Sequence, residues 1–270
     1  MASAGIVSNM ATPSHRHDMI SFQAVRKAFA RHAVLDDVSL AIERGSFVAL
    51  VGESGAGKTT LLKAINRLVE IDRGTILIDG EPINGIPLHE LRRRIGYVFQ
   101  GVGLFPHMSV AQNIWLVPRL QNLPMESRAA RVSELLDLVS LPDDVAARYP
   151  AQLSGGQAQR VGFARALAAN PSLMLMDEPF GALDPVTRSE LGRAYRALHE
   201  RMGLTSILVT HDMAEALLLA DRIIVLGGGG ILADMPPRDL LHFTGDKSVR
   251  AMIDVVRDQA DQLEALGKAL

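Results

Sequence analysis

The stretch Gly52-Glu53-Ser54-Gly55-Ala56-Gly57-Lys58-Thr59, with Thr60 directly after it, decides the fold. It matches the phosphate-binding pattern G-x-x-x-x-G-K-[ST] and lies between a predicted strand at residues 47–51 and a predicted helix at 60–69. The glycines let backbone N–H groups point into a concave nest for phosphate oxygens, beside the positive end of the helix. Lys58 would reach the β- and γ-phosphates, and the Thr59 hydroxyl would bind Mg²⁺. Because chance produces this pattern in roughly 1% of chains of this length, we predict a nucleotide site here, Thr60 included, rather than a glycine-rich turn.

The composition excludes several classes of protein. The 270 residues are 48% hydrophobic and only 4% aromatic, which fits a folded protein of one large domain or two small ones. The net charge of -2 provides no positive field for nucleic acid, so we expect no nucleic-acid partner. Without cysteine the chain has no disulfide, thiolate nucleophile or Cys-based zinc site, which fits a reducing compartment.

Neither a membrane span nor a secretion signal is predicted. A spanning helix needs about 20 consecutive apolar residues, and the most apolar stretch, 223–233, is short and interrupted by glycines at 227–230. Residues 1–18 lack the apolar core of a secretion signal and are predicted to form a flexible tail. His15 and His17 within that tail are too few ligands for a metal site.

Aliphatic runs alternate with helical patterns along most of the chain, which predicts βαβ units and a largely parallel sheet. Before the helix at 60–69, three closely spaced strand candidates at 21–29, 38–42 and 47–51 predict an antiparallel patch. Residues 109–169 hold no strand pattern and at least three helical ones, which predicts a helical insertion at about 101–169. Further patterns predict strands at 75–78, 96–99, 173–176, 206–209 and 223–226, and helices at 185–202 and 213–220.

The last residues carry a separate helical pattern. Ile253, Val256, Ala260 and Leu263 follow a/d-like spacing and predict one short helix of about 30 Å at most. This helix would dock on the parent domain or, alternatively, form a dimer contact. We therefore divide the chain into a flexible tail at 1–18, a nucleotide-binding domain at 19–241 and a helical tail at 242–270.

Two adjacent acids follow the apolar strand pattern at 173–176. Asp177 and Glu178 would lie at the carboxyl end of that strand, where parallel sheets bind their ligands. A buried strand that ends in acids is common, so the pattern is weak by itself. Together with the phosphate loop, it predicts that Asp177 holds Mg²⁺, usually through water, and that Glu178 polarises the water that attacks the γ-phosphate.

The pentapeptide Leu153-Ser154-Gly155-Gly156-Gln157 opens a helical pattern that runs to about residue 169. Taken alone, it could be a helix start in which Ser154 is the N-cap and the glycines allow close packing. It also resembles the signature sequence of ABC-transporter ATPases. The other motifs of that family occur in matching order around it: the phosphate loop, Gln100, the signature, Asp177-Glu178, Ala182-Leu183-Asp184 and His211.

The resemblance implies a fold and an assembly. The fold is the α/β ABC ATPase fold, a RecA-like P-loop NTPase core with an N-terminal antiparallel β patch and an inserted helical subdomain. In this family two protomers join head to tail, and each ATP lies between the phosphate loop of one protomer and the signature of the other. The resemblance therefore adds five residues to the expected ATP contacts: Ser154, Gly155, Gly156, Gln157 and Asp184.

Three single residues take roles from the same resemblance. Gln100 is expected to touch Mg²⁺ and the attacking water while it links the core to the helical insertion. His211 is expected to contact the γ-phosphate and to orient Glu178. Phe29 matches the position of the family's adenine-stacking aromatic residue, usually Tyr, although Phe29 could equally be a core residue.

Four further segments resemble the ATPases of importers for glycine betaine, choline and related quaternary amines: Ile95 to Gln100, Gly103 to Ser109, Asn113-Ile114 and Val117-Pro118. Those relatives often carry a C-terminal pair of regulatory CBS domains, for which these 270 residues leave no room, so we expect no ionic-strength sensing of that kind in this sequence.

The resemblance implies an ATP- and Mg²⁺-dependent ATP hydrolase that works as the subunit of an importer. Its expected partners are a second copy of the chain, a separate membrane permease and, indirectly, a substrate-binding protein, and its expected place is the cytoplasmic face of the membrane. The alternatives are an exporter subunit and an ABC ATPase that acts on DNA or ribosomes. A P-loop kinase is a third possibility, against which the signature pentapeptide argues.

Overall fold

The structure is a computed structural model that describes residues 18–30, 32–101 and 103–268. Its centre is a sheet of six strands in the order β10-β9-β3-β8-β7-β6, in which only β10 runs antiparallel to its neighbour. The central strands are buried aliphatic runs, as parallel sheets covered on both faces require. The strands are β3 (Phe47–Val51), β6 (Ile95–Val98), β7 (Leu173–Asp177), β8 (Thr205–Val209), β9 (Arg222–Gly227) and β10 (Gly230–Met235).

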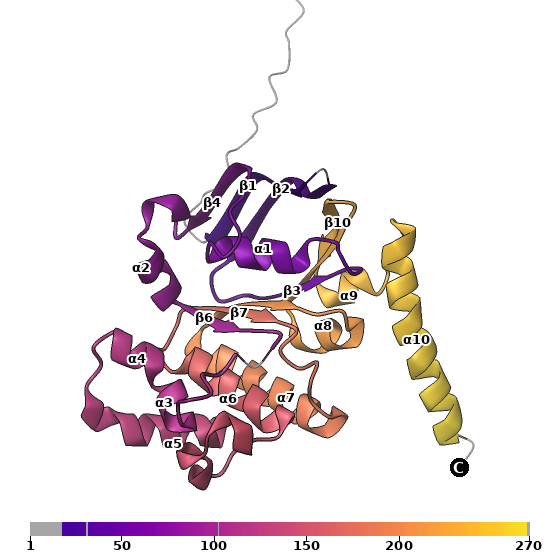
Figure 1. Cartoon of the computed structure of the whole chain (residues 1–270). Coiled ribbons are helices and arrows are strands. Elements are labelled where there is room, and N and C mark those ends of the chain that lie inside the picture. The colour runs from indigo at the N-terminus through magenta and orange to yellow at the C-terminus, as the bar shows by residue number, and fades with distance from the viewer. Residues whose placement is uncertain (1–17, 31, 102, 269–270) are drawn as a thin grey trace, which may run out of the picture.

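A second, antiparallel sheet covers one side of this centre, in the order β2-β1-β4-β5 (Figure 1). The predicted antiparallel patch is therefore confirmed, but its predicted membership is wrong. Phe47–Val51 belongs to the parallel sheet, because all five of its residues are buried and both faces need cover. The later segment Arg73–Ile78 joins the patch instead. Its strands are β1 (Asp18–Phe29), β2 (His32–Glu43), β4 (Arg73–Ile78) and β5 (Glu81–Pro82).

Helices, joined by turns and short 3-10 segments, make up most of the rest of the described chain. Between β6 and β7 the described residues form helices and turns without a strand. The helix predicted at 60–69 begins earlier and ends earlier, because Lys58 and Thr59 form its first turn and Arg67, at φ 53°, leaves the helical conformation. The α-helices are α1 (Lys58–Ile65), α2 (Leu88–Arg93), α3 (Val110–Ile114), α4 (Leu116–Leu120), α5 (Arg128–Leu138), α6 (Gly155–Leu167), α7 (Pro185–Met202), α8 (Met213–Leu219), α9 (Pro237–Leu240) and α10 (Lys247–Lys268).

Short 3-10 segments connect these elements at Ile83–Gly85, Met125–Ser127, Asp143–Ala147 and Pro150–Gln152. In the described part of the chain, no helix is both long and apolar enough to cross a membrane. The tail predicted at 1–18, with His15 and His17, lies outside the described residues except for Asp18, which begins β1.

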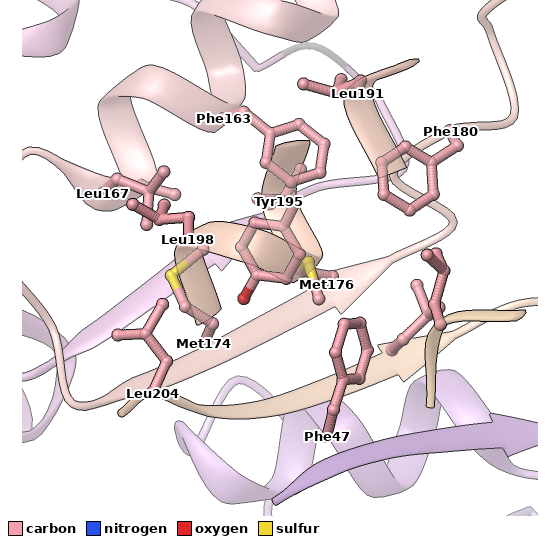
Figure 2. Packing of buried hydrophobic residues seen from close by; sticks show 14 of the residues in the cluster. Phe47, Phe163, Leu167, Met174, Met176, Phe180, Leu191, Tyr195, Leu198 and Leu204 are labelled. Carbon is pink, nitrogen blue, oxygen red and sulfur yellow. The ribbon is translucent and has the colours of Figure 1, made fainter. Parts of the chain in front are cut away.

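The core consists of two apolar clusters, one on each face of the central sheet, because successive residues of β3 point to opposite sides. Phe47 packs with Phe163 of α6 and Tyr195 of α7 on one face (Figure 2). On the other face, Leu50 packs with α1 and the antiparallel sheet. Figure 1 shows the resulting layers, with α1 and α6 on opposite sides of the sheet.

This packing brings the sequence motifs to one edge of the sheet. The strands β3, β6, β7 and β8 run parallel, so their carboxyl ends meet at the same edge. Each strand is followed within two residues by one motif residue: Gly52, Gln100, Glu178 and His211.

Candidate functional site

A cleft of about 600 Å³ opens at that edge of the sheet. It brings together eleven of the residues predicted from the sequence, which come from β1, the phosphate loop, α1 and the segments after β6, β7 and β8. Val34 of β2 completes the wall, and no sequence signal had pointed to it. The predicted residues in the lining are Phe29, Ser54, Gly55, Ala56, Gly57, Lys58, Thr59, Thr60, Gln100, Glu178 and His211.

The phosphate loop has a backbone that only glycine can follow at two points. Gly52 has φ 149°, and a Cβ atom there would collide with the carbonyl oxygen of Leu226. Gly57 has φ 93°, and a Cβ atom there would lie 2.7 Å from the carbonyl oxygen of Val34. The loop is thus fixed between β9 and β2 by close backbone contacts.

Lys58 points back into this loop. Its side chain is only 8% exposed, and its Nζ donates to the carbonyl oxygens of Gly52 at 2.7 Å and Glu53 at 2.8 Å. Burial lowers the pKa of the Lys58 ammonium, although the carboxylates of Glu178 and Asp177 act in the opposite direction. A buried cation whose direct partners are neutral carbonyl groups fits an anionic ligand such as a phosphate group.

Asp177 and Thr59 form a second polar cluster beside the loop. The Thr59 hydroxyl donates to Asp177 Oδ1 at 2.8 Å, and Lys63 Nζ lies 3.9 Å from Asp177 Oδ2. Burial raises the pKa of the Asp177 carboxyl, while the Thr59 hydrogen bond and the Lys63 charge lower it. Lys63 was missed in the sequence, although it follows Thr59 by four residues and therefore lies on the same face of α1.

This cluster fits Mg²⁺ better than a metal that needs a complete protein cage. Among the described residues, no group of three or more His, Cys, Asp or Glu side chains could hold a metal ion. Mg²⁺ is usually held by one or two carboxylates together with phosphate oxygens and waters. The Thr59 hydroxyl and the Asp177 carboxylate, next to a loop shaped for phosphate, supply such a donor set.

Glu178 is held between two side chains at the mouth of the cleft. Gln100 Nε2 donates to Glu178 Oε2 at 3.2 Å, and His211 Nδ1 lies 3.5 Å from Glu178 Oε1. The backbone of Glu178 has φ 45°, which is uncommon for a residue other than glycine and costs on the order of 1–3 kcal/mol. Its N–H donates to the carbonyl oxygen of Val209 on β8, which holds this conformation.

The signature residues lie at the start of α6 and do not line the cleft. Ser154 is the N-cap of α6, and its side chain and that of Gln157 accept each other's backbone N–H in a capping box, so the capping interpretation is confirmed. The close-packing interpretation is wrong for Gly155, because a Cβ atom there would meet nothing within 4 Å. Gly156 would meet only a methyl group of Leu183, at 3.4 Å. Packing within one chain therefore does not explain Gly155.

Asp184 also lies outside the cleft. Its side chain is the N-cap of α7 and accepts the backbone N–H groups of Val186 at 3.1 Å and Thr187 at 3.0 Å. Within one chain, Asp184, Ser154 and Gln157 therefore cap helix starts outside the cleft.

A family model described as ABC transporter matches residues 35–181, just over half of the chain. The chain belongs to the ABC transporter family. The matched part of this ABC cassette runs from β2 to the end of the segment that carries Asp177 and Glu178. It therefore includes the phosphate loop, Gln100 and the signature.

Individual relatives agree with this assignment. The cassette is 49% identical over 232 residues to the glycine betaine uptake system ATP-binding protein YehX of Escherichia coli K12, covering 86% of this chain and 75% of that protein. It is 48% identical over 236 residues to the choline transport ATP-binding protein OpuBA of Bacillus subtilis 168, covering 87% of this chain but 62% of that protein. The chain thus spans less than two thirds of the length of the second relative.

A solved structure shares the ABC cassette fold. It is the dimeric ATP-binding cassette MJ0796 in a post-hydrolysis state bound to ADP and Pi, with a TM-score of 0.75 and 35% sequence identity. The likeness covers 82% of this chain and 99% of that one. The predicted α/β fold with its P-loop NTPase core is confirmed by this neighbour together with the family match.

Gly52 and Gly155 should respond to alanine with changes in stability of different size. Gly52→Ala should lower the free energy of unfolding by about 2 kcal/mol or more, because its Cβ would collide with the Leu226 carbonyl at a strained φ. Gly155→Ala should change it by less than about 0.5 kcal/mol, because the added methyl group meets nothing. Urea unfolding of both variants measures the difference, and equal stabilities would contradict the backbone geometry described for the loop.

Proposed function

We propose that this cassette binds and hydrolyses ATP with Mg²⁺, and that it drives the import of a quaternary amine through a separate membrane permease. The proposal that the cassette hydrolyses ATP rests on the position of the Glu178 carboxylate. It lies between Gln100 and His211 at the mouth of the cleft that the phosphate loop opens. A carboxylate held by two partners at the edge of a phosphate site is suited to orient a water molecule for attack.

Each side chain has one task in this proposal. The N–H groups of the phosphate loop and the Lys58 ammonium bind the phosphates of ATP, and Phe29 at the cleft offers its ring to the adenine. Thr59, Asp177 and Gln100 would hold Mg²⁺, which supplies charge neutralisation at the phosphates when it is bound. Glu178 accepts a proton from the attacking water, and His211 stabilises the position of the Glu178 carboxylate and contacts the γ-phosphate.

Replacing the proposed base separates binding from hydrolysis. Glu178→Gln should bind ATP with nearly unchanged affinity and hydrolyse it at least about 100-fold more slowly, because the amide cannot accept the proton. Nucleotide titration and phosphate release measure the two effects, with Glu126→Gln, an exposed position in Met125–Ser127, as the matched control. Hydrolysis close to that of the wild type would remove Glu178 from this role.

Two copies of the chain are needed to complete the site in this proposal. Gly155 faces open space without a packing or conformational reason to be glycine, and a structural neighbour of this fold is a dimer. We infer that the signature residues Ser154 to Gln157 approach ATP bound to the phosphate loop of a second copy, together with Asp184. The open space at Gly155 then leaves room for the phosphate groups of that ATP, beside the N-terminus of α6.

Mixing two inactive variants tests the shared sites. Gly156→Asp should abolish hydrolysis, because it places a side chain and a negative charge where a phosphate approaches. Lys58→Ala should also abolish hydrolysis, because it removes the cation of the phosphate loop. In their heterodimer, one composite site carries both changes and the other carries neither, so ATPase activity should return on mixing. Lys58→Ala mixed with Glu178→Gln is the control, because each of its sites keeps one change. A Gly156→Asp variant that is fully active alone would contradict the shared site.

A second cleft, of about 380 Å³, is suited to the permease. It shares no lining residue with the nucleotide cleft and lies between the end of α1, β6, α4 and α6. The rings of Phe99 and Phe105 line it and are each more than 40% exposed. Phe99 directly precedes Gln100, whose side chain donates a hydrogen bond to Glu178. A permease segment that contacts Phe99 in this cleft would therefore lie next to the residue that holds the proposed base.

The charges of this cleft indicate what its occupant offers. Arg92, Arg93 and Arg165 line it, and none of the described residues in its lining is acidic. Arg165 is buried, its Nη1 donates to the Gly103 carbonyl oxygen at 2.6 Å, and burial lowers the pKa of its guanidinium. We infer that the permease inserts a segment with apolar side chains and at least one carboxylate, and that the cassette lies at the cytoplasmic face of the membrane.

The import of quaternary amines is proposed from the relatives whose names state glycine betaine and choline transport, and the permease from the second cleft. A substrate-binding protein would deliver the solute on the other side of the membrane. The corresponding measurement is uptake of labelled glycine betaine and choline by cells without this gene, complemented with the wild-type chain. Restored transport of a chemically different solute alone would contradict the substrate class and leave the ATPase proposal intact.

Phe105→Asp tests the docking cleft. The Phe105 side chain is exposed, so the fold should persist, but a carboxylate there would repel the acidic group of the permease. We expect unchanged ATPase activity of the isolated cassette, with loss of permease binding and of solute uptake. Leu123→Asp is the matched control, because Leu123 is similarly exposed and does not line the cleft. Normal permease binding by Phe105→Asp would contradict the assignment.

A further inference from the structure

The C-terminal helix α10 is only half covered by its own chain. It has 22 residues and is therefore about 33 Å long, so the predicted upper limit of about 30 Å is slightly too short. Val249 and Ile253 are buried in the core cluster and Met252 and Val256 pack against it, whereas every residue from 257 to 266 is exposed. The earlier expectation of docking on the parent domain thus holds for the first half alone, and Figure 1 shows the helix extending past α8 and α9.

The apolar stripe of α10 does not end where the cover ends. Val249, Ile253, Val256, Ala260 and Leu263 follow one another at alternating spacings of four and three residues. This is the spacing of a coiled-coil seam, with Ile253 and Ala260 at a positions and Val256 and Leu263 at d positions. Leu263 is 71% exposed, and Leu266 beside it is 65% exposed. The second half therefore presents an apolar face that no described residue of the chain covers.

We propose that this second half of α10 packs antiparallel against the same segment of a second copy of the chain. A two-fold contact of this kind needs a surface that is complementary to itself, and the segment meets that requirement. In the antiparallel arrangement, Ala260 of each helix faces Leu263 of the other, so small and large side chains alternate across the seam. The contact does not involve the nucleotide cleft and does not depend on the proposed hydrolysis.

The charges beside the seam select the antiparallel orientation. Antiparallel helices bring e positions together, which places Arg257 of each copy near Glu264 of the other. Parallel helices would instead bring e positions against g positions, and the g positions Met252, Gln259 and Leu266 carry no charge. The parallel pair would thus form no ion pair across the interface, whereas the antiparallel pair would add one to the Arg257–Asp254 ion pair within each helix.

The small area of the contact between the two α10 helices limits the strength of their association. A seam of three turns per helix is much smaller than the roughly 1,200–2,000 Å² that stable interfaces bury. By itself it gives weak association, but it keeps two cassettes at a high effective concentration. The α10 contact therefore slows the separation of the two chains while the nucleotide sites are open.

Sedimentation of the full-length protein without nucleotide measures this contact separately from ATP-dependent association. Leu263→Asp should weaken dimerisation at least about tenfold, because it places two carboxylates across the seam. Val255→Asp is the matched control, since Val255 is an exposed apolar residue of α10 that lies off the stripe. The control should leave the dimer unchanged. Equal association of Leu263→Asp and the wild type would overturn the proposal, whether the chains stay monomeric or dimerise elsewhere.

Cross-linking tests the orientation, because the natural chain has no cysteine. A mixture of Ala260→Cys and Leu263→Cys should form a disulfide-linked dimer under mild oxidation, since these positions face each other in the antiparallel seam. Each single variant alone should cross-link much less. Efficient cross-linking of Ala260→Cys with itself would overturn the antiparallel arrangement, and cross-linking to the permease instead of a second copy would overturn the proposed partner.

Discussion

The site depends on one close backbone contact, between Gly52 and the carbonyl oxygen of Leu226. Because no Cβ atom fits there, β9 fixes the point at which β3 turns into the phosphate loop. The loop then bends over the Lys58 side chain, whose ammonium lies against two of the loop's own carbonyl groups. Burial makes this cation costly without an anion, which supports the proposal that the loop binds a phosphate group.

The chemistry-bearing residues were predictable from the sequence because each follows a strand of one parallel sheet. Gln100, Glu178 and His211 lie within two residues of a strand end, and buried aliphatic runs mark those strands clearly. The place of Phe47–Val51 was predicted wrongly because its short spacing to the earlier strands suggested that it belonged to the antiparallel patch. Its unbroken run of five apolar residues was the better signal, because a strand without alternating polar residues is covered on both faces, and all five residues are buried.

Other features could not be predicted, because they arise from contacts between distant segments. The strained φ of Glu178 depends on its hydrogen bond to Val209, and the wall formed by Val34 depends on how β2 crosses the loop. The opposite case is Gly155, where close packing was the alternative offered by the pentapeptide taken alone and the structure has open space. The open space at Gly155 supports the proposal that the signature approaches ATP bound to a second copy of the chain.

The two proposed contacts between copies of the chain respond differently to nucleotide. The contact through the signature depends on phosphate charge next to Lys58 and the start of α6, so it weakens when hydrolysis and release remove that charge. The contact through α10 buries apolar side chains such as Leu263, and its free energy does not depend on what the cleft holds. Hydrolysis therefore weakens one contact and leaves the free energy of the other unchanged, so the phosphate loops can separate before the C-terminal helices do.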